Sequence, residues 1–260
     1  MSLIKYLPFL LILGFFLWVF LFPASIRRLL RRSGRQIGDI HRAGEELLGG
    51  DEVQGSPLAR YEAGAGRIVE EKILASHPLH GDRFVQDRVA FVGGRLLAAA
   101  HRREIAYRFR VIDAPVPTAY SLPGGAVLVS RALVDLAGSD DNQLAGILAH
   151  EVAHIDRRHA VKNMAKTAAA RMGLRILSLG HGAILARAIG SLEGLLEKGY
   201  GRTEELEADR YALDLMARSG YDPRAYSFFL RGLLDRRLEN AGHFRTHPPV
   251  AERLRAMGAE

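Results

Sequence analysis

The sequence contains no cysteine among its 260 residues. This absence excludes disulfide frameworks, thiolate-ligated zinc sites and cysteine nucleophiles, although it leaves the compartment of the protein open. Basic residues are in excess, with a formal net charge of +7, but no basic run is interleaved with aromatic side chains that could stack on bases. We therefore expect no nucleic-acid partner.

One long apolar run begins the chain, at residues 3–22, and is interrupted only by a lysine, a proline and a glycine. Its length suits a helix that crosses a lipid bilayer. Phe22 stands where the cleavage site of a signal peptide needs a small residue, so we expect residues 1–25 to remain as one transmembrane anchor. Five arginines follow between Arg27 and Arg35, which predicts a single-pass membrane protein with its C-terminal bulk in the cytoplasm. The alternative is the periplasmic or exported side, with these arginines on anionic lipid head groups.

The chain after the anchor divides by composition. Residues 26–82 are polar and contain Gly-Gly and Ser-Pro breakers, so we predict a linker of short helices there. Helical and strand periodicities then dominate residues 83–260, which we interpret as one folded domain.

The most informative motif is His150-Glu151-Val152-Ala153-His154. Residues four apart on an α-helix differ by about 40° around its axis, so both imidazoles leave one face and can bind the same ion. The motif supplies all of the polar side chains between Leu144 and Ile155, and buried polar groups cost free energy unless they are satisfied. We therefore predict a zinc site with His150 and His154 as ligands and Glu151 as the general base.

A catalytic zinc ion normally has three protein ligands, so a third must come from elsewhere. The metzincin pattern would place Gly and His three and six residues after His154, but Arg157 and Ala160 stand there. His159 lies about 140° around the helix from His154, so we expect it to pack or to face solvent rather than to bind metal.

An acidic segment further along the chain offers the missing ligand. On the helix predicted around residues 203–218, Glu205 and Asp209 share the apolar face, whereas Glu204 and Glu207 share the opposite, solvated face. We assign Glu205 as the third zinc ligand and Asp209 as the acceptor that fixes the tautomer of a ligating histidine.

Shorter periodic segments surround these motifs. We predict a helix over 84–101 and a strand over 107–112, and interpret 119–129 as two short strands or as a strand and a turn. Ser139 or Asp140 can cap the motif helix. The fold class is therefore α+β, mostly helical, with a small sheet beside the zinc helix.

Residues 164–196 are apolar and helical in pattern, but three arginines divide them and leave no uncharged run of about twenty residues. We predict a helical hairpin over the metal site, lying against the bilayer, rather than a transmembrane hairpin.

Taken in order, three motifs resemble the HtpX-type zinc metalloproteases, the gluzincin family that includes CAAX prenyl endopeptidase. They are the motif at 150–154, the E-x-x-A-D string at 205–209 and His247-Pro248-Pro249. The resemblance extends from about residue 89 to 257. It implies a zincin-type domain with one zinc ion per chain, here preceded by one N-terminal transmembrane helix.

The resemblance also implies that His247 approaches the metal, where its imidazole donates to the oxyanion of the reaction or caps the zinc in a resting state. The alternative is a turn histidine before two prolines. Tyr200 and Arg202 are further candidates for the donor, although an arginine at this position can simply pair with acids.

The function that follows is hydrolysis of peptide bonds within a polypeptide, unfolded or membrane-associated, as in protein quality control. A strand formed by Ala119, Tyr120, Ser121 and Leu122 at the sheet edge could bind the substrate by strand addition. Two alternatives stay open: a noncatalytic membrane-tethered binding or chaperone module, and a zinc exopeptidase. The single anchor gives no reason to expect prenyl-protein specificity.

Overall fold

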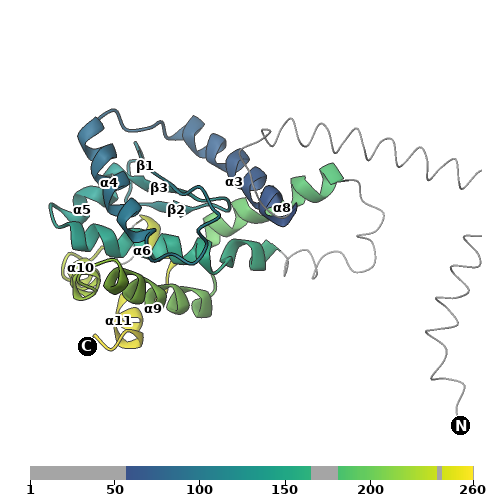
Figure 1. Ribbon diagram of the computed structural model, residues 1–260. Coiled ribbons are helices and arrows are strands. Elements are labelled where there is room, and N and C mark those ends of the chain that lie inside the picture. Colours follow the sequence, from purple (N-terminus) through teal and green to yellow (C-terminus); the bar gives the residue numbers. More distant parts are fainter. Residues whose placement is uncertain (1–56, 165–180, 239–241, 260) are drawn as a thin grey trace, which may run out of the picture. The chain divides into compact units, whose positions relative to one another are not determined.

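The computed structural model describes residues 57–164, 181–238 and 242–259, and its fold there is α+β. Most of these residues are helical and surround a three-stranded sheet (Figure 1). The elements are α3 (Pro57–Ser76), α4 (Arg83–Leu96), β1 (Arg108–Ile112), β2 (Ala119–Ser121), β3 (Ala126–Ser130), α5 (Arg131–Ala137), α6 (Asp141–Asp156), α8 (His181–Lys198), α9 (Arg202–Arg218), α10 (Arg224–Asp235), η3 (Gly242–Thr246) and α11 (Val250–Ala256). The helix and strands predicted around the motif are therefore confirmed, although the helix predicted over 84–101 ends already at Leu96.

The sheet has the strand order β1-β3-β2, with β1 parallel and β2 antiparallel to β3. The central strand β3 is buried along its whole length. Val127 and Val129 pack into the larger core with α4 and α6, whereas Ala126 and Leu128 pack into a smaller core with α3 and α8. Helices therefore cover both faces of the sheet, which explains why β3 reads as a continuous apolar run rather than an alternating one.

The turn between β2 and β3 also forms part of the contact with α3. Gly124 has a φ of +85°, a left-handed conformation that glycine adopts without steric cost. Gly66 of α3 lies so close to the turn that a Cβ added there would be 1.8 Å from the Pro123 carbonyl oxygen. Glycine on both sides thus lets the helix and the turn approach closely.

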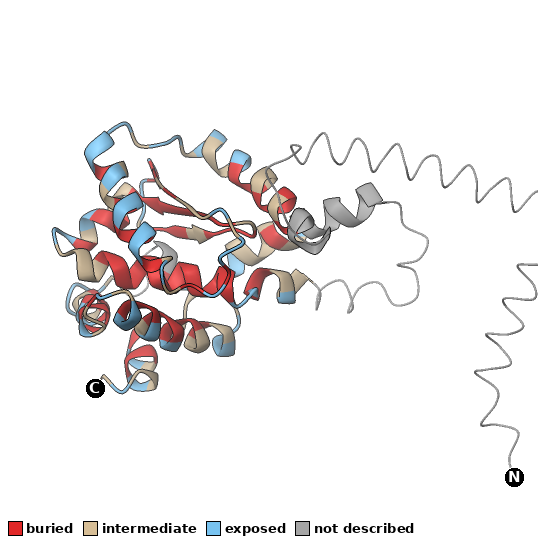
Figure 2. Cartoon of the chain, viewed as in Figure 1, coloured by how far each residue is buried: buried red, intermediate tan, exposed pale blue. Residues whose placement is uncertain are grey.

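Helix α6 carries the histidine motif through the centre of the larger core. Its N-cap is Asp140, whose side chain accepts a hydrogen bond from the backbone N–H of Asn142. Every residue from Leu144 to Asp156 is buried, and Figure 2 shows this helix as the most continuously buried one. It packs against α9, α10, α4 and β2, so its buried polar side chains need partners from other parts of the protein.

Three predicted segments lie wholly or partly outside the described residues. The anchor expected at 1–25 is one, and most of the linker expected at 26–82 is another. Of that linker the structure describes α3 as one helix of 20 residues, which packs against α8 and β3. The hairpin expected at 164–196 is described only in part, as α8. Within the described residues, no helix combines the length and apolar character that a membrane crossing requires.

Candidate metal centre

Helices α6 and α9 bring three side chains from distant parts of the sequence to one point. The Nε2 atoms of His150 and His154 are 3.1 Å apart. Glu205 Oε2 lies 3.4 Å from His150 Nε2, and its Oε1 lies 3.7 Å from His154 Nε2. Because zinc–ligand bonds are about 2 Å long, atoms about 3 to 4 Å apart can share one ion.

The chemistry of these donors fits a divalent cation. The Glu205 side chain is fully buried, and neither carboxylate oxygen has a hydrogen-bond partner among the described residues. A buried carboxylate without hydrogen bonds is costly unless a positive charge compensates it. Two imidazoles and one carboxylate are a donor set that zinc commonly takes.

The Nδ1 atom of His150, on the side of the ring away from Glu205, contacts Asp209. The distance between His150 Nδ1 and Asp209 Oδ1 is 2.9 Å, so a proton on Nδ1 leaves Nε2 directed at Glu205. Burial by itself would lower the pKa of His150, but the hydrogen bond to Asp209 and the nearby Glu205 carboxylate outweigh it and raise this pKa to about 9. The site therefore favours positive charge.

Asp209 is itself held by Arg253 of α11 and Tyr226 of α10. Arg253 Nη2 and Nε donate to the two Asp209 oxygens at 2.7 and 2.9 Å, and the Tyr226 hydroxyl lies 3.2 Å from Oδ1. Burial would raise the pKa of Asp209, but the charge of Arg253 holds it well below its usual range. The acceptor behind His150 is thus an ionised carboxylate.

His154 has different neighbours. The ring of Tyr200 stacks on its imidazole, with ring centroids 3.9 Å apart and an interplanar angle of 14°. Its Nδ1 lies 2.9 Å from Nδ1 of His159, which is fully buried. His159 therefore packs, as the sequence suggested, but it does so directly against a candidate metal ligand. Burial lowers the pKa of His159 to about 4.

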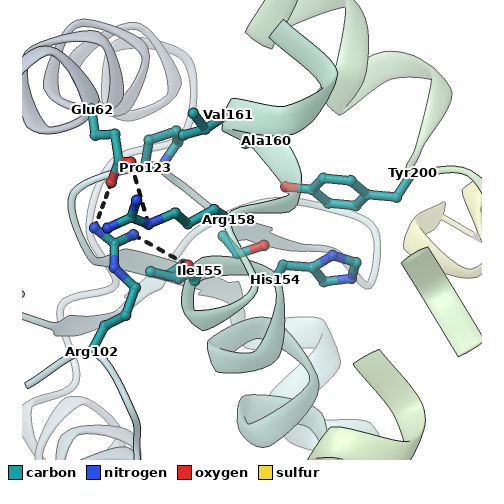
Figure 3. A pocket seen from close by; sticks show the side chains of 10 residues that line it. Glu62, Arg102, Pro123, His154, Ile155, Arg158, Ala160, Val161 and Tyr200 are labelled. Atoms are coloured by element: carbon teal, nitrogen blue, oxygen red, sulfur yellow. Dashed lines mark hydrogen bonds and ion pairs between the residues drawn. The ribbon is translucent and has the colours of Figure 1, made fainter. Parts of the chain in front are cut away.

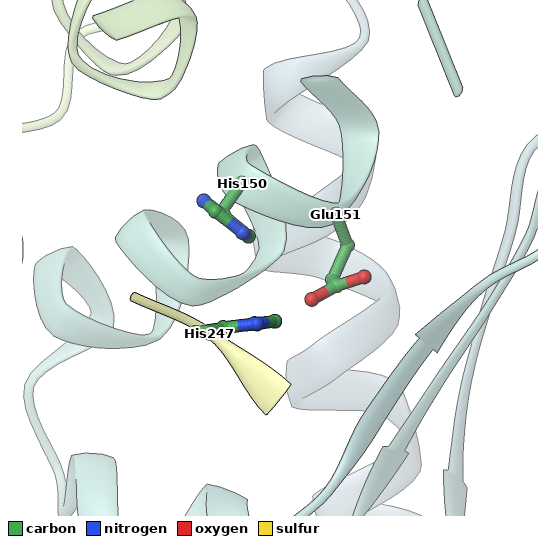
Figure 4. A group of neighbouring side chains, drawn as sticks. All are labelled: His150, Glu151 and His247. Atoms are coloured by element: carbon green, nitrogen blue, oxygen red, sulfur yellow. The ribbon is translucent and has the colours of Figure 1, made fainter. Parts of the chain in front are cut away.

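Glu151 and His247 lie on the remaining side of the centre. Figure 4 shows the Glu151 carboxylate directed toward the ring of His247, with His150 next to both. His247 Nδ1 lies 3.3 Å from Glu205 Oε2, and its ring centroid is 5.3 Å from that of His150. The segment between η3 and α11 thus brings a third imidazole to the cluster.

Strand β2, expected to bind substrate, is an edge strand of the sheet and contacts α6. Two backbone hydrogen bonds mark the bonded pairs of this antiparallel ladder. The N–H of Ser130 donates to the Thr118 carbonyl, and the N–H of Leu122 donates to the Ala126 carbonyl. Since such pairs alternate, the backbone groups of Ala119 and Ser121 point away from β3. The tip of β2 also borders a small pocket.

That pocket lies beside His154, between α3, the β2–β3 turn and the end of α6. Figure 3 shows the Tyr200 hydroxyl directed into it, with Glu62 paired to two arginines on the far side. Arg102 Nη2 donates to Glu62 at 2.7 Å, and Arg158 Nε lies 3.8 Å from the same carboxylate. The pocket wall is thus polar but charge-compensated.

Of the other candidate donors, Tyr200 lies in the cluster and Arg202 does not. The Arg202 side chain is 72% exposed and pairs with Glu252, as the alternative interpretation held. Burial raises the pKa of Tyr200, and the charge of Glu151 adds to this effect, so its hydroxyl keeps its proton.

Neither Arg253 nor Tyr226 was expected at the centre from the sequence, although both contact Asp209. Arg253 comes shortly after the His247-Pro248-Pro249 motif, and this position is its one sequence signal. Tyr226 carried none, because a tyrosine on an amphipathic helix is usually a core residue.

Comparison with known proteins agrees with this geometry. The sequence profile of peptidase family M48 matches residues 84–260. The beta-barrel assembly-enhancing protease of Escherichia coli (strain K12) is 27% identical over 205 residues, which are 74% of this chain and 39% of that protein. The mitochondrial metalloendopeptidase OMA1 of Schizosaccharomyces pombe is 31% identical over 171 residues, covering 63% and 49% of the two chains. The chain therefore spans about two fifths to one half of the length of these relatives.

Proposed function

The chain belongs to peptidase family M48, as its motifs indicated, and from this premise we propose that it is a zinc-dependent endopeptidase that hydrolyses peptide bonds within polypeptides. The observation that carries the proposal is the buried, unbonded carboxylate of Glu205 facing the Nε2 atoms of His150 and His154. These three residues are the proposed zinc ligands, with one ion per chain. A bound zinc ion supplies Lewis acidity, which acidifies water and polarises a carbonyl group.

The other residues of the cluster have roles in moving and stabilising charge. Glu151 accepts the proton of the attacking water and returns it to the leaving amine, since its carboxylate lies beside the ligand His150 and beside His247. His247 donates a hydrogen bond to the oxyanion of the transition state, an interaction worth about 3 to 4 kcal/mol in a comparable site. Asp209 keeps the proton of His150 on Nδ1.

Substrate binding is proposed to occur along β2, at Ala119, Tyr120, Ser121 and Leu122. The backbone groups of Ala119 and Ser121 point away from β3, so an extended polypeptide that reaches this edge would pair with them and gain affinity with little sequence selectivity. The pocket beside His154 would receive one side chain. N-methylation of successive amides in a cleaved peptide should raise KM at alternate positions, whereas a uniform effect would contradict strand pairing.

The direct test uses the purified full chain and unfolded casein. Wild-type protein should cleave casein, a chelator should stop the reaction, and zinc should restore it. Glu151→Gln should retain about one zinc per chain yet lose turnover, whereas Glu205→Ala should lose both. Glu204→Gln, one residue earlier on α9, is the matched control and should keep activity. A Glu151→Gln protein that still cleaves would refute the assignment of the base.

Two alternatives give different outcomes in the same assay. A binding or chaperone module would retain casein without cleaving it, with or without zinc. An aminopeptidase, the exopeptidase that acts from the N terminus, would fail on peptides with a blocked N terminus, whereas an endopeptidase cuts them internally.

We further propose that residues 1–25 anchor the protein in a membrane and that the chain from 26 to α3 is a linker. The protease domain then acts on the cytoplasmic side, on unfolded or membrane-associated proteins. The apolar run at 3–22 and the arginines that follow it support this arrangement. Extraction of membranes with alkaline carbonate should leave the chain in the pellet. Protease digestion of sealed vesicles of both orientations should show the domain exposed on the cytoplasmic face, and protection there would favour the exported side.

A further inference from the structure

We propose that His159 is a positioning residue for the metal centre: its Nδ1 accepts a hydrogen bond from Nδ1–H of His154 and so directs Nε2 of His154 toward the metal. This inference rests on the proposed zinc site and adds to it a second support, behind the other ligating histidine. His159 touches no reacting atom.

The geometry around His159 defines a chain of polar contacts. Its Nδ1 is 2.9 Å from His154 Nδ1, and its Nε2 is 3.5 Å from Glu207 Oε2. The other Glu207 oxygen lies 3.1 Å from Nε of Arg157. This series of polar contacts therefore runs from the buried candidate ligand His154 to a half-exposed ion pair at the surface.

The direction of these hydrogen bonds follows from the tautomers. If Nε2 of His154 binds a metal, the proton of this neutral imidazole must be on Nδ1, which then donates. Nδ1 of His159 must accept, so the His159 proton is on Nε2, where it faces the Glu207 carboxylate. The two Nδ1 atoms then have defined donor and acceptor roles, and Nε2 of His159 faces Glu207 at ion-pair distance without a hydrogen bond among the described residues.

The backbone supports a specific role for this contact. Helix α6 ends at Asp156, and Arg158 has a φ of +55°, a left-handed conformation that is unfavourable for a residue with a side chain. A continued helix would have carried His159 about 140° away from His154. The turn at Arg158 instead folds the next helical turn back, so that the His159 ring meets His154 edge-on with centroids 5.0 Å apart.

The two candidate ligands are thus supported in parallel but unequal ways. His150 donates directly to the fully buried anion Asp209, which Arg253 holds. His154 donates to a neutral imidazole, and the carboxylate and arginine lie one step further away. Because an anionic acceptor strengthens a ligand more than a neutral one, loss of His159 should cost less zinc affinity than loss of Asp209.

The test compares His159→Leu with His159→Asn in the full chain. The asparagine carboxamide places an acceptor oxygen where Nδ1 of histidine was, whereas leucine fills similar space without an acceptor. The zinc dissociation constant is measured by competition with a chromophoric chelator, and the thermal midpoint of the metal-free protein reports folding. We expect His159→Leu to weaken zinc binding by about 10-fold or more, within the range found for such outer partners, and His159→Asn to recover most of this loss.

A second variant protects the test against misfolding of His159→Leu. Glu207 is half-exposed, so Glu207→Leu should fold, and it should weaken zinc binding several-fold by freeing the His159 ring to turn. Equal zinc affinity in wild type and His159→Leu, or equal losses in the leucine and asparagine variants, would overturn the proposal. Neither result touches the proposed function, which fails only if wild-type protein binds no zinc or does not cleave.

Discussion

Replacement of Arg253 by methionine tests how far the centre depends on a buried ion pair. Arg253 is 1% exposed, and its guanidinium makes two hydrogen bonds to Asp209 and a third, at 2.6 Å, to the Tyr226 hydroxyl. Methionine fills much of the same volume but removes the guanidinium, so that only His150 can still compensate the charge of the fully buried Asp209 carboxylate. The imidazole of His150 and the Tyr226 hydroxyl remain as its neighbours.

Breaking a buried ion pair by removing one partner costs about 3 to 5 kcal/mol, because the other charge stays buried. For a domain of about 200 residues this corresponds to a fall of roughly 6 to 20 °C in Tm. The measurement is urea or thermal unfolding of the metal-free protein, since zinc would add its own stabilisation. Adding Asp209→Asn to Arg253→Met should recover part of the loss, because the uncompensated charge is then gone.

The matched control is Arg218→Met on α9. Arg218 makes an ion pair with Asp214 at 2.9 Å, one helical turn earlier and largely in solvent. Exposed pairs of this kind contribute about 0.3 to 0.5 kcal/mol. If Arg253→Met costs no more than this control, the Asp209 carboxylate does not depend on Arg253 and the reasoning about the buried pair is wrong.

Three further predictions test the packing around the site. Gly66→Ala should destabilise the protein by about 1 to 3 kcal/mol, because the new Cβ overlaps the Pro123 carbonyl. Gly94→Ala on α4 is the control: its Cβ meets open space, so the variant should be neutral or slightly stabilised. Equal effects of the two substitutions in urea unfolding would contradict the contact of α3 with the β2–β3 turn. Asp156→Ala should lower the free energy of unfolding by about 3 kcal/mol or more, because it removes the acceptor of two backbone N–H groups and two tyrosine hydroxyls. A loss below about 1 kcal/mol in the same assay would show that water replaces the carboxylate as acceptor. Chelation of zinc should lower Tm reversibly, and added zinc at 100 times Kd should restore about 2.7 kcal/mol; a Tm that ignores zinc would exclude a metal bound only to the folded state.

Local periodicity was enough to predict much of the centre. The spacing of His150 and His154 placed both imidazoles on one face of a helix, and the projection of the acidic segment separated Glu205 and Asp209 from Glu204 and Glu207. In the structure, Glu205 and Asp209 are fully buried, whereas Glu204 and Glu207 are partly exposed. These predictions succeeded because the face of a regular helix depends only on residues a few positions apart.

His159 packs as expected, but the same projection misplaced it relative to His154, because the helix stops being regular before it. The projection that set His159 apart from His154 assumed that α6 continues, but the left-handed residue Arg158 ends it and turns the imidazole back. Likewise, Glu207 seemed only a solvated acid, yet it contacts both Arg157 and His159.

The amino-acid sequence by itself thus determined which helices carry the polar groups and which of those groups must be buried. Only the tertiary structure decided their partners: Arg253 reaches Asp209 across 44 residues of sequence, and His150 reaches it across 59. The physical reason is that a buried charge needs some compensating group, whereas the choice of that group depends on how α6, α9, α10 and α11 pack together. No periodicity within one helix contains that information.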